Sequence, residues 1–335
     1  MPSSATLTDV SKHMVDATQA SGTGVRKNPL LAPYLFVKKE LAAKRGLGIV
    51  NTCFRMLSVL AHPGQHWQVM QAIGGAHTKG LLKAYPRAVY RYTLPYLSMN
   101  FDRAERQRLL KGHYDFLNTA LSASFYERVM DDAMVLWEQE IQGNLFSISV
   151  SGPCMHREGD LTLVFKMDGC AVYRIAFSLV ASPLLKLNPQ FQQNISRHIV
   201  YVGQVQGYPG GFEHLRQATK QCRDVAPADL LMAAVAGLAG ALGITMVAGV
   251  GYENSLSYQN LLKLKSNFSY ADFWEKHHGI RSEGGHYILQ VPLAEKPIQQ
   301  VKANHRGRTL LKRELKKQVT DEAERVMRPL VLKRA

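Results

Sequence analysis

The residues best suited to acid–base chemistry are a neighbouring carboxylate and imidazole, Glu213 and His214. They come shortly after a predicted strand, Ile199–Val205, so we expect them at a strand end that borders a cleft. A histidine oriented by a carboxylate can take a proton from an amine or hydroxyl nucleophile, which makes His214 a candidate general base. The alternative interpretation is an exposed helix face that has no chemical role.

Polar residues also follow the next predicted strand, Ile244–Val250. Tyr252 stands where a phenol can protonate a leaving thiolate, and either Tyr252 or Asn254 can position a reacting carbonyl. The alternative for Tyr252 is a ring that packs against the end of the strand. The candidate catalytic residues are Glu213, His214, Tyr252 and Asn254.

A predicted helix begins at Pro227, a favoured first-turn residue, and its N-terminal N–H groups can bind an anion. Arg216, Lys220 and Arg223 precede it closely and are potential charge partners for a phosphate. Thr219 and Lys220 have a second interpretation, as the end of a short helix. The candidate residues for binding a donor or cofactor are Gln206, Arg216, Thr219, Lys220 and Arg223.

The spacing of histidines and cysteines does not predict a metal site. His62 and His66 are four residues apart, but Pro63 and Gly64 predict a helix break between them. The adjacent pair His277–His278 has no third ligand near it in the sequence. Scattered cysteines favour reduced thiols over disulfides or a zinc ribbon; they are Cys53, Cys154, Cys170 and Cys222.

These groups must be positioned by a chain of 335 residues, of which 46% are hydrophobic and 20% charged. That composition predicts folded cores and leaves room for two modest domains. The 41 lysines and arginines exceed the 26 acidic residues, and the net charge of +15 favours phosphate-bearing partners: nucleic acid, an anionic membrane surface or a phosphorylated cofactor. We expect a cytoplasmic location, because the first 27 residues do not read as a signal peptide.

The hydrophobic pattern changes near Gly143. Before it, apolar residues recur every three or four positions, which predicts helices, and after it they alternate, which predicts strands. The first 28 residues lack such a pattern, and the last forty hold twelve basic and four acidic residues. The predicted parts are a flexible leader (1–28), a helical domain (29–142), an acyltransferase-like mixed-sheet domain (143–295) and a basic helical tail (296–335).

Three of the predicted strands form an antiparallel meander, a fourth follows, and a helix then leads to a fifth. A strand–helix–strand connection joins parallel strands through a right-handed crossover. Gly237 and Gly240 share one side of that helix, so we expect it to approach the sheet closely. The fold class is therefore α+β, with an N-terminal helical part followed by a mixed sheet and flanking helices. The strands are predicted at Leu145–Val150, Leu161–Met167, Ala171–Val180, Ile199–Val205 and Ile244–Val250.

Several blocks of the sequence resemble one bacterial family, the VirK or YbjX proteins, grouped under the domain of unknown function 535. The order and spacing of the blocks agree over residues 30–320. The resemblance implies a bacterial cytoplasmic protein, and the family is associated with virulence and resistance to antimicrobial peptides. The blocks are His113–Leu117, Glu158–Leu161, Val202–Gly207, Ala218–Lys220, Pro227–Leu231, Tyr270–Glu275 and Asn304–Arg308.

The predicted order of strands also resembles the central part of a GCN5-related acyltransferase. In that fold, a splayed pair of strands admits the pantetheine arm and a helix N-terminus holds the pyrophosphate. The usual glycine-rich pyrophosphate loop is absent from Arg216–Pro227. The resemblance therefore leaves open three donors: coenzyme A, the phosphopantetheine of an acyl-carrier protein, and an aminoacyl donor.

Two functions from different classes follow from these patterns. The first is an acyl- or aminoacyl-transferase that uses a thioester or phosphate-bearing donor and an amine or hydroxyl acceptor. The alternative is a non-enzymatic binding protein, acting through its basic residues 302–317 at an anionic membrane surface or on nucleic acid. The tail has few aromatic residues for base stacking, which favours the membrane version of this alternative.

Overall fold

The computed structural model describes residues 55–131, 133–152, 157–191, 195–257 and 268–332. The chain divides into two compact units, Met1–Leu57 and Ser58–Ala335. The second unit holds all of the elements described below. The predicted leader over residues 1–28 lies outside the described residues, as do Cys53 and Cys154.

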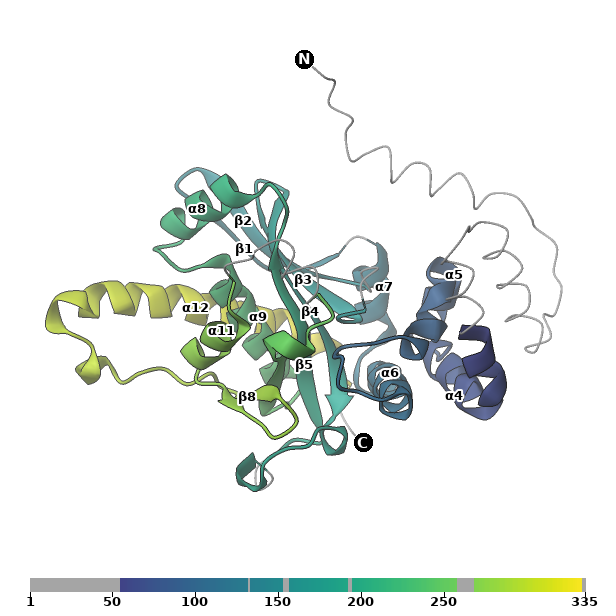
Figure 1. The fold of residues 1–335 in the computed structure, drawn as a ribbon. Helices are drawn as coiled ribbons and strands as arrows, with labels where there is room; N and C mark the ends of the chain where they lie inside the picture. The colour runs from purple at the N-terminus through teal and green to yellow at the C-terminus, as the bar shows by residue number, and fades with distance from the viewer. Residues whose placement is uncertain (1–54, 132, 153–156, 192–194, 258–267, 333–335) are drawn as a thin grey trace, which may run out of the picture. The chain divides into compact units, whose positions relative to one another are not determined.

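An eight-stranded sheet forms the centre of the second unit (Figure 1). Its strand order is β1-β2-β3-β4-β5-β6-β8-β7, and β5 and β6 are its one parallel pair among the described residues. This confirms an α+β fold with a mixed sheet. The strands are β1 (Met134–Ile141), β2 (Asn144–Ser151), β3 (Leu161–Met167), β4 (Cys170–Ala181), β5 (His198–Gly207), β6 (Met246–Val250), β7 (Ile280–Arg281) and β8 (His286–Gln290).

The five predicted strands are confirmed, but the sheet begins earlier than the expected change at Gly143. β1 precedes that residue and pairs with β2. The register between these strands shifts between Val135 and Trp137, so the two-residue alternation that marks a strand is interrupted in β1. This interruption explains why the sequence pattern of β1 does not read as a strand.

Helix α9 (Pro227–Ala241) connects β5 to β6 and is buried along almost its whole length. The helix packs on the sheet, but its glycines face α12 (Arg306–Met327) and not the sheet, which corrects the role expected for them. A Cβ on Gly237 would lie 2.2 Å from the carbonyl oxygen of Thr320 in α12, and one on Gly240 would lie 3.2 Å from Glu324. These two glycines therefore allow α12 to pack against α9.

Helix α6 (Arg103–Ala120) packs against β4, with a capping box at its start formed by Asp102 and Glu105. The buried His113 in this helix accepts a hydrogen bond at Nδ1 from the backbone N–H of Leu179 in β4, at 3.0 Å. Other helices among the described residues include α4 (Pro63–Ile73), α5 (Lys79–Ala84), η2 (Pro86–Thr93), α7 (Ala123–Asp131), α8 (Phe212–Gln221) and α11 (Tyr270–Lys276).

Candidate functional site

The parallel strands β5 and β6 part at their C-terminal ends. Their pairing ends at Val202 opposite Gly249, although β5 continues to Gly207. On the other side of β5, Gln204 pairs with Ala176 and Val202 pairs with the next residue of β4, so Gly203 has no partner and forms a β-bulge. Bulges bend a strand and are common beside active sites. The bulge and the parting of the strands therefore occur at the same place.

One face of the sheet is polar beside this bulge. Residues paired across antiparallel strands share a face, so the ladder fixes which side chains stand together. The opposite face of the same strands carries Leu163, Ile175 and Val205, which are all apolar and buried. The two rows on the polar face are Ser149–Val164–Arg174–Gln206 and Ser151–Thr162–Ala176–Gln204.

Several polar atoms on this face are buried without a partner among the described residues. They are Oγ of Ser149, Oγ1 of Thr162, Nε of Arg174 and Oε1 of Gln204. Oε1 of Gln206, by contrast, accepts hydrogen bonds from Arg174 at 3.1 Å and from Gln204 at 2.9 Å. Buried donors and acceptors that lack a protein partner are places where a ligand or an ordered water binds. Gln206 thus belongs to a cluster of polar side chains, of which it is the one member that the sequence singled out as a candidate.

The peptide of Glu158 lies directly on the bulge. A Cβ on Gly203 would be 2.1 Å from the carbonyl oxygen of Glu158, so only glycine allows this contact. The carboxylate of Glu158 is nearly buried and accepts a hydrogen bond from Oγ of Ser257 at 2.9 Å. In the sequence, Glu158 stands out only as part of the family block Glu158–Leu161. Its contact with Gly203, in the block Val202–Gly207, could not be read from the sequence, because only the fold brings these two blocks together.

Two aromatic side chains of α11 cover the gap between β5 and β6. The backbone N–H of Val205 donates to the hydroxyl of Tyr270 at 3.2 Å, and the indole N–H of Trp274 donates to the carbonyl of Val250 at 2.9 Å. A Cβ on Gly249 would lie 2.3 Å from the Trp274 ring, so this strand residue must be glycine. Burial raises the pKa of Tyr270 to about 12, which keeps its hydroxyl neutral. The backbone N–H of Val205 and the backbone carbonyl of Val250 therefore both have side-chain partners in α11.

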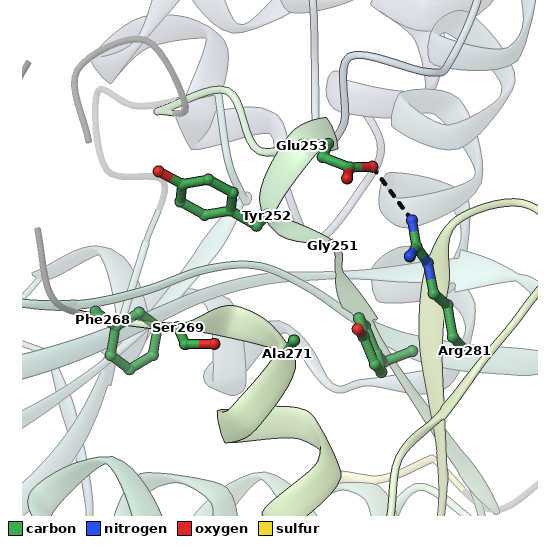
Figure 2. A pocket seen from close by; sticks show the side chains of 8 residues that line it. Gly251, Tyr252, Glu253, Phe268, Ser269, Ala271 and Arg281 are labelled. Atoms are coloured by element: carbon green, nitrogen blue, oxygen red, sulfur yellow. Dashed lines mark hydrogen bonds and ion pairs between the residues drawn. The ribbon is translucent and has the colours of Figure 1, made fainter. Parts of the chain in front are cut away.

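A pocket of about 380 Å³ opens beyond the end of β6 (Figure 2). Within it, Nη2 of Arg281 lies 3.2 Å from Oε2 of Glu253, and both side chains are exposed. Tyr252 lines the same pocket. The pocket therefore combines aromatic walls with a phenol, a carboxylate and a guanidinium. Its lining residues are Gly251, Tyr252, Glu253, Phe268, Ser269, Ala271, Arg281 and Tyr287.

Asn254, the other candidate after β6, holds neighbouring loops together. Its side-chain amide donates to the carbonyl of Gly285 at 3.4 Å, and its own carbonyl accepts from the backbone N–H of Met99 at 2.8 Å. His214 is exposed on α8, and its neighbour Glu213 forms an exposed ion pair with Arg216 at 3.0 Å. The structure therefore brings Tyr252 to a pocket, whereas Glu213 and His214 stand on an open helix surface.

The basic residues predicted around the start of α9 have separate partners. Besides the pairing of Arg216 with Glu213, Arg223 donates to the carbonyl of Leu311 at 3.1 Å and to Glu314 at 3.0 Å, both in α12. The hydroxyl of Thr219 donates to a carbonyl within α8, and Lys220 is exposed in the last turn of that helix.

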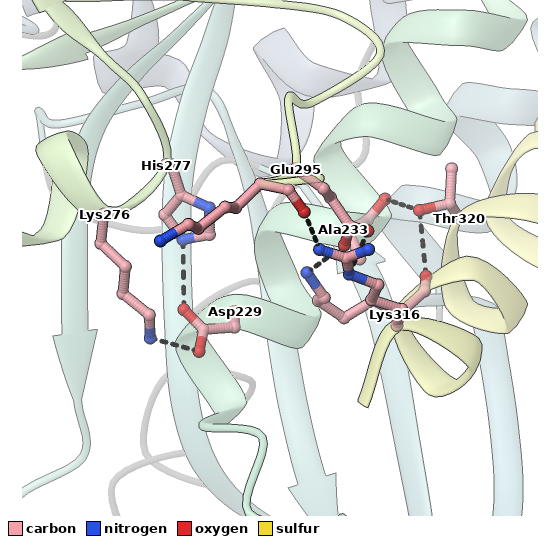
Figure 3. A network of polar contacts seen from close by, with 9 residues as sticks. Asp229, Ala233, Lys276, His277, Glu295, Lys316 and Thr320 are labelled. Carbon is pink, nitrogen blue, oxygen red and sulfur yellow. Dashed lines mark hydrogen bonds and ion pairs between the residues drawn. The ribbon is translucent and has the colours of Figure 1, made fainter. Parts of the chain in front are cut away.

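The first turn of α9 carries a carboxylate of its own, that of Asp229 (Figure 3). It accepts hydrogen bonds from Lys276 at 2.5 Å and His277 at 3.1 Å, both at the end of α11. Burial opposes ionisation of Asp229, but the bonds from His277 and Lys276 hold its pKa below the ordinary value. The carboxylate of Asp229 thus places a negative charge of the protein itself beside this helix N-terminus.

Comparison with known proteins places this geometry in a family. A family model described as "Protein of unknown function (DUF535)" matches residues 51–319, and so includes the bulge, the polar face and the pocket. The chain belongs to this family. The uncharacterized protein YbjX of Escherichia coli (strain K12) is 27% identical over 237 residues, which are 68% of this chain and 68% of that protein. The predicted resemblance to the VirK and YbjX proteins is confirmed. No solved structure matches.

Two separate family blocks meet at Asp160, whose side chain is fully buried. Its carboxylate accepts hydrogen bonds from Arg91 at 2.6 Å, Tyr114 at 3.0 Å and Ser178 at 2.8 Å, and a further one from Tyr96. Asp160 follows Glu158 and Gly159 directly, so this network fixes the turn that places Glu158 on the bulge. The family blocks therefore build the support of the candidate site.

Within the described ranges, no cluster of three or more histidine, cysteine or acidic residues is arranged to hold a metal ion. The predicted helix break is confirmed, because His62 is a non-helical residue and α4 begins after it at Pro63, a favoured first-turn residue. His66 is buried in that helix, and its Nδ1 lies 3.1 Å from the Tyr92 hydroxyl. The helices of the described residues include none with the length and apolar character needed to cross a membrane.

Proposed function

We propose that this protein is an acyl- or aminoacyl-transferase whose reaction takes place where β5 and β6 part. The observation that carries this proposal is the parting of β5 and β6 at the Gly203 bulge, together with a pocket beyond the end of β6. A meander, a crossover helix and a single parallel pair are also the features that suggested a GCN5-related acyltransferase. Ligands of sheets with helical crossovers bind beyond the carboxyl ends of the parallel strands.

The chemistry needs a base for the acceptor and an acid for the leaving group. The amine or hydroxyl of the acceptor attacks the donor carbonyl, and Glu158 accepts the proton that the nucleophile releases. As the bond from that carbonyl to the donor sulfur or oxygen breaks, Tyr252 protonates the leaving group. We assign the base to Glu158 instead of His214, because Glu158 is nearly buried beside the bulge and His214 is exposed on α8.

The donor is a carrier-bound acyl or aminoacyl group and not free coenzyme A. The carboxylate of Asp229 stands in the first turn of α9 and repels a pyrophosphate there. Tyr270 and Trp274 engage the backbone of the parted strands, so the phosphopantetheine of an acyl-carrier protein would enter through the pocket beyond β6. The guanidinium of Arg281 remains at the open pocket, where it can bind a phosphate or carboxylate of the donor.

The test offers the purified protein three labelled donors in parallel: acyl-coenzyme A, an acyl-carrier protein loaded with the same acyl chain, and aminoacyl-tRNA. Mass spectrometry then follows transfer to small amines and alcohols. We expect transfer from one of the two carrier-bound donors, and a large loss of transfer in Tyr252→Phe if that donor is the ester, aminoacyl-tRNA. Lys79→Gln, an exposed residue at the start of α5 and outside the site, is the matched control. Absence of transfer from all three donors, with no acyl or aminoacyl mass retained on the purified protein, would contradict the proposal.

A further inference from the structure

The first turns of α12 stand free of the protein core. No residue between Arg306 and Glu314 is buried, whereas Leu315, Val319, Ala323 and Met327 further along the same helix are. More than two turns of regular helix are therefore presented to the surroundings, although their hydrogen-bonded backbone gives them a fixed shape.

Helix α8 and the segment after it are joined to these turns. Arg223 donates hydrogen bonds to the carbonyl of Leu311 and the carboxylate of Glu314. The carboxylate of Asp224 forms an ion pair with Arg308 at 3.2 Å. The ammonium of Lys312 donates to the backbone carbonyl of Asp224 at 3.0 Å. Residues 212–226 and 302–317 thus form one continuous surface, here called the α8–α12 surface.

This surface concentrates the positive charge of the protein. Its two segments hold ten lysines and arginines and three acidic residues, a net charge of +7 out of +15 for the whole chain. Six of these ten cations form ion pairs, three of them with carboxylates outside the surface: Arg216 with Glu213, Arg308 with Asp224, Arg223 with Glu314, Arg313 and Lys316 with Glu295, and Lys317 with Asp321. Pairing with exposed carboxylates is weak, so the summed field remains positive.

Large apolar side chains stand among these cations. Phe212 is 72% exposed at the start of α8, and Leu310 and Leu311 are 53% and 50% exposed in α12. Phe212 shares its helix stripe with Arg216 and Lys220, four and eight residues later. Leu310 likewise lies between two basic residues: Arg306 is four positions before it and Arg313 is three positions after it. Each helix therefore presents an apolar residue flanked by cations.

We propose that the α8–α12 surface docks on a bilayer leaflet that contains anionic phospholipids. Basic residues attract the headgroups, and the exposed phenylalanine and leucines enter the boundary between headgroups and acyl chains. Nucleic acid fits less well, since one exposed phenylalanine offers little stacking and the leucines would gain nothing from a phosphate backbone. Docking does not depend on the proposed transfer reaction and is tested without any substrate.

The experiment measures flotation of the full-length protein with vesicles of phosphatidylcholine alone and with 30% phosphatidylglycerol. We expect binding only to the anionic vesicles, and a steep loss of binding with added salt. Each basic residue near an anionic surface contributes about fivefold to partitioning, so Lys220→Gln with Arg306→Gln lowers it about 25-fold. Phe212→Ser lowers it further without changing the charge. Leu145→Ser and Lys186→Gln, exposed residues outside this surface, are the matched controls.

Two outcomes would overturn the proposal. The first is that the Phe212→Ser protein and the protein with Lys220→Gln and Arg306→Gln both bind the anionic vesicles as strongly as the unaltered protein does. The second is binding of a duplex oligonucleotide, at the same salt concentration, that depends on Lys220 and Arg306 but not on Phe212, with no flotation of the vesicles. In that case the surface binds nucleic acid through charge alone. Circular dichroism of each variant confirms that it is folded.

Discussion

The carboxylate of Asp160 lies 2.6 Å from the guanidinium of Arg91, and the aspartate side chain has no exposed surface. Burial raises the pKa of a carboxyl group, but Arg91, His113 and the hydrogen bonds from Tyr96 and Ser178 hold the pKa of Asp160 below its ordinary value. The charge is therefore present inside the fold and is fully hydrogen-bonded. This pair anchors the turn that carries Glu158, so it links the stability of the protein to the geometry of the candidate site.

Breaking this pair from one side should be strongly destabilising. Arg91→Met leaves the Asp160 charge buried without its main partner, and we expect a loss of about 3–5 kcal/mol in the free energy of unfolding. Adding Asp160→Asn to the same protein should recover part of that loss, because the uncompensated charge is removed. Urea denaturation of the single and double variants measures the coupling. Lys317→Met, which breaks an exposed pair with Asp321, should cost less than about 0.5 kcal/mol.

Three buried histidines should make the fold sensitive to mild acid. Burial lowers the pKa of His66, His113 and His286 to about 4, whereas an unfolded histidine titrates near 6.5. Between these two values the unfolded chain binds more protons than the folded one, so the free energy of unfolding falls as the pH falls. At pH 5 each histidine should cost on the order of 2 kcal/mol relative to pH 7.

Denaturation midpoints measured between pH 7 and pH 4.5 check this dependence. His286→Gln removes one of the three groups, and its stability should fall less steeply with pH than that of the unaltered protein. Asp160 adds to the loss only at lower pH, since its folded pKa lies below 3.8 and its stabilisation disappears as the pH falls through that folded value. A pH profile that is flat between 7 and 5 would contradict the assignment of neutral, buried histidines.

The bulge in β5 should tolerate no side chain. In Gly203→Ala the new methyl group would meet the carbonyl oxygen of Glu158 at 2.1 Å, and backbone cannot move aside as a flexible side chain can. We expect a loss of about 1–3 kcal/mol in unfolding free energy. Gly112→Ala is the matched control, because nothing lies within 4 Å of the added Cβ in the middle of α6. That variant should gain about 0.5–1 kcal/mol through helix propensity.

Most of the sheet was predictable because its strands have regular alternation or clear turns. The segment Leu161–Met167 and the crossover through Pro227 are examples, and both are confirmed. The contacts of Gly237 were not predictable, because small residues on a helix indicate a close neighbour without identifying it. Here that neighbour is α12, eighty residues later in the chain.

The candidate site was predictable only where a side chain follows its strand directly. Tyr252 follows β6, so its position at the end of the strand follows from the local sequence. Glu158 and Gly203 are 45 positions apart, and their contact depends on a bulge and on the network around Asp160. Arg216 and Arg223 were expected together at α9, but nearby carboxylates and carbonyls, at Glu213 and in α12, hold them instead.

Replacing Glu158 should lower turnover strongly, whereas replacing His214 should leave turnover nearly unchanged. Glu158→Gln preserves the oxygen that accepts the hydrogen bond from Ser257, so the fold should be kept while the base is lost. A positioned general base contributes about a hundredfold or more, and we expect turnover to fall by that factor once a donor is known. His214→Ala, on an exposed helix face, should leave turnover within about twofold.

Tyr252→Phe completes this comparison, because it removes only the hydroxyl that protonates the leaving group. We expect turnover to fall about a hundredfold with a poor leaving group such as an alkoxide and much less with a thiolate, which departs without protonation. Initial rates with matched ester and thioester donors measure the difference, and thermal denaturation shows that each variant is folded. If His214→Ala abolishes transfer while Glu158→Gln and Tyr252→Phe keep full activity with both donors, the reaction takes place on α8. The bulge between β4 and β5 would then have a structural role only.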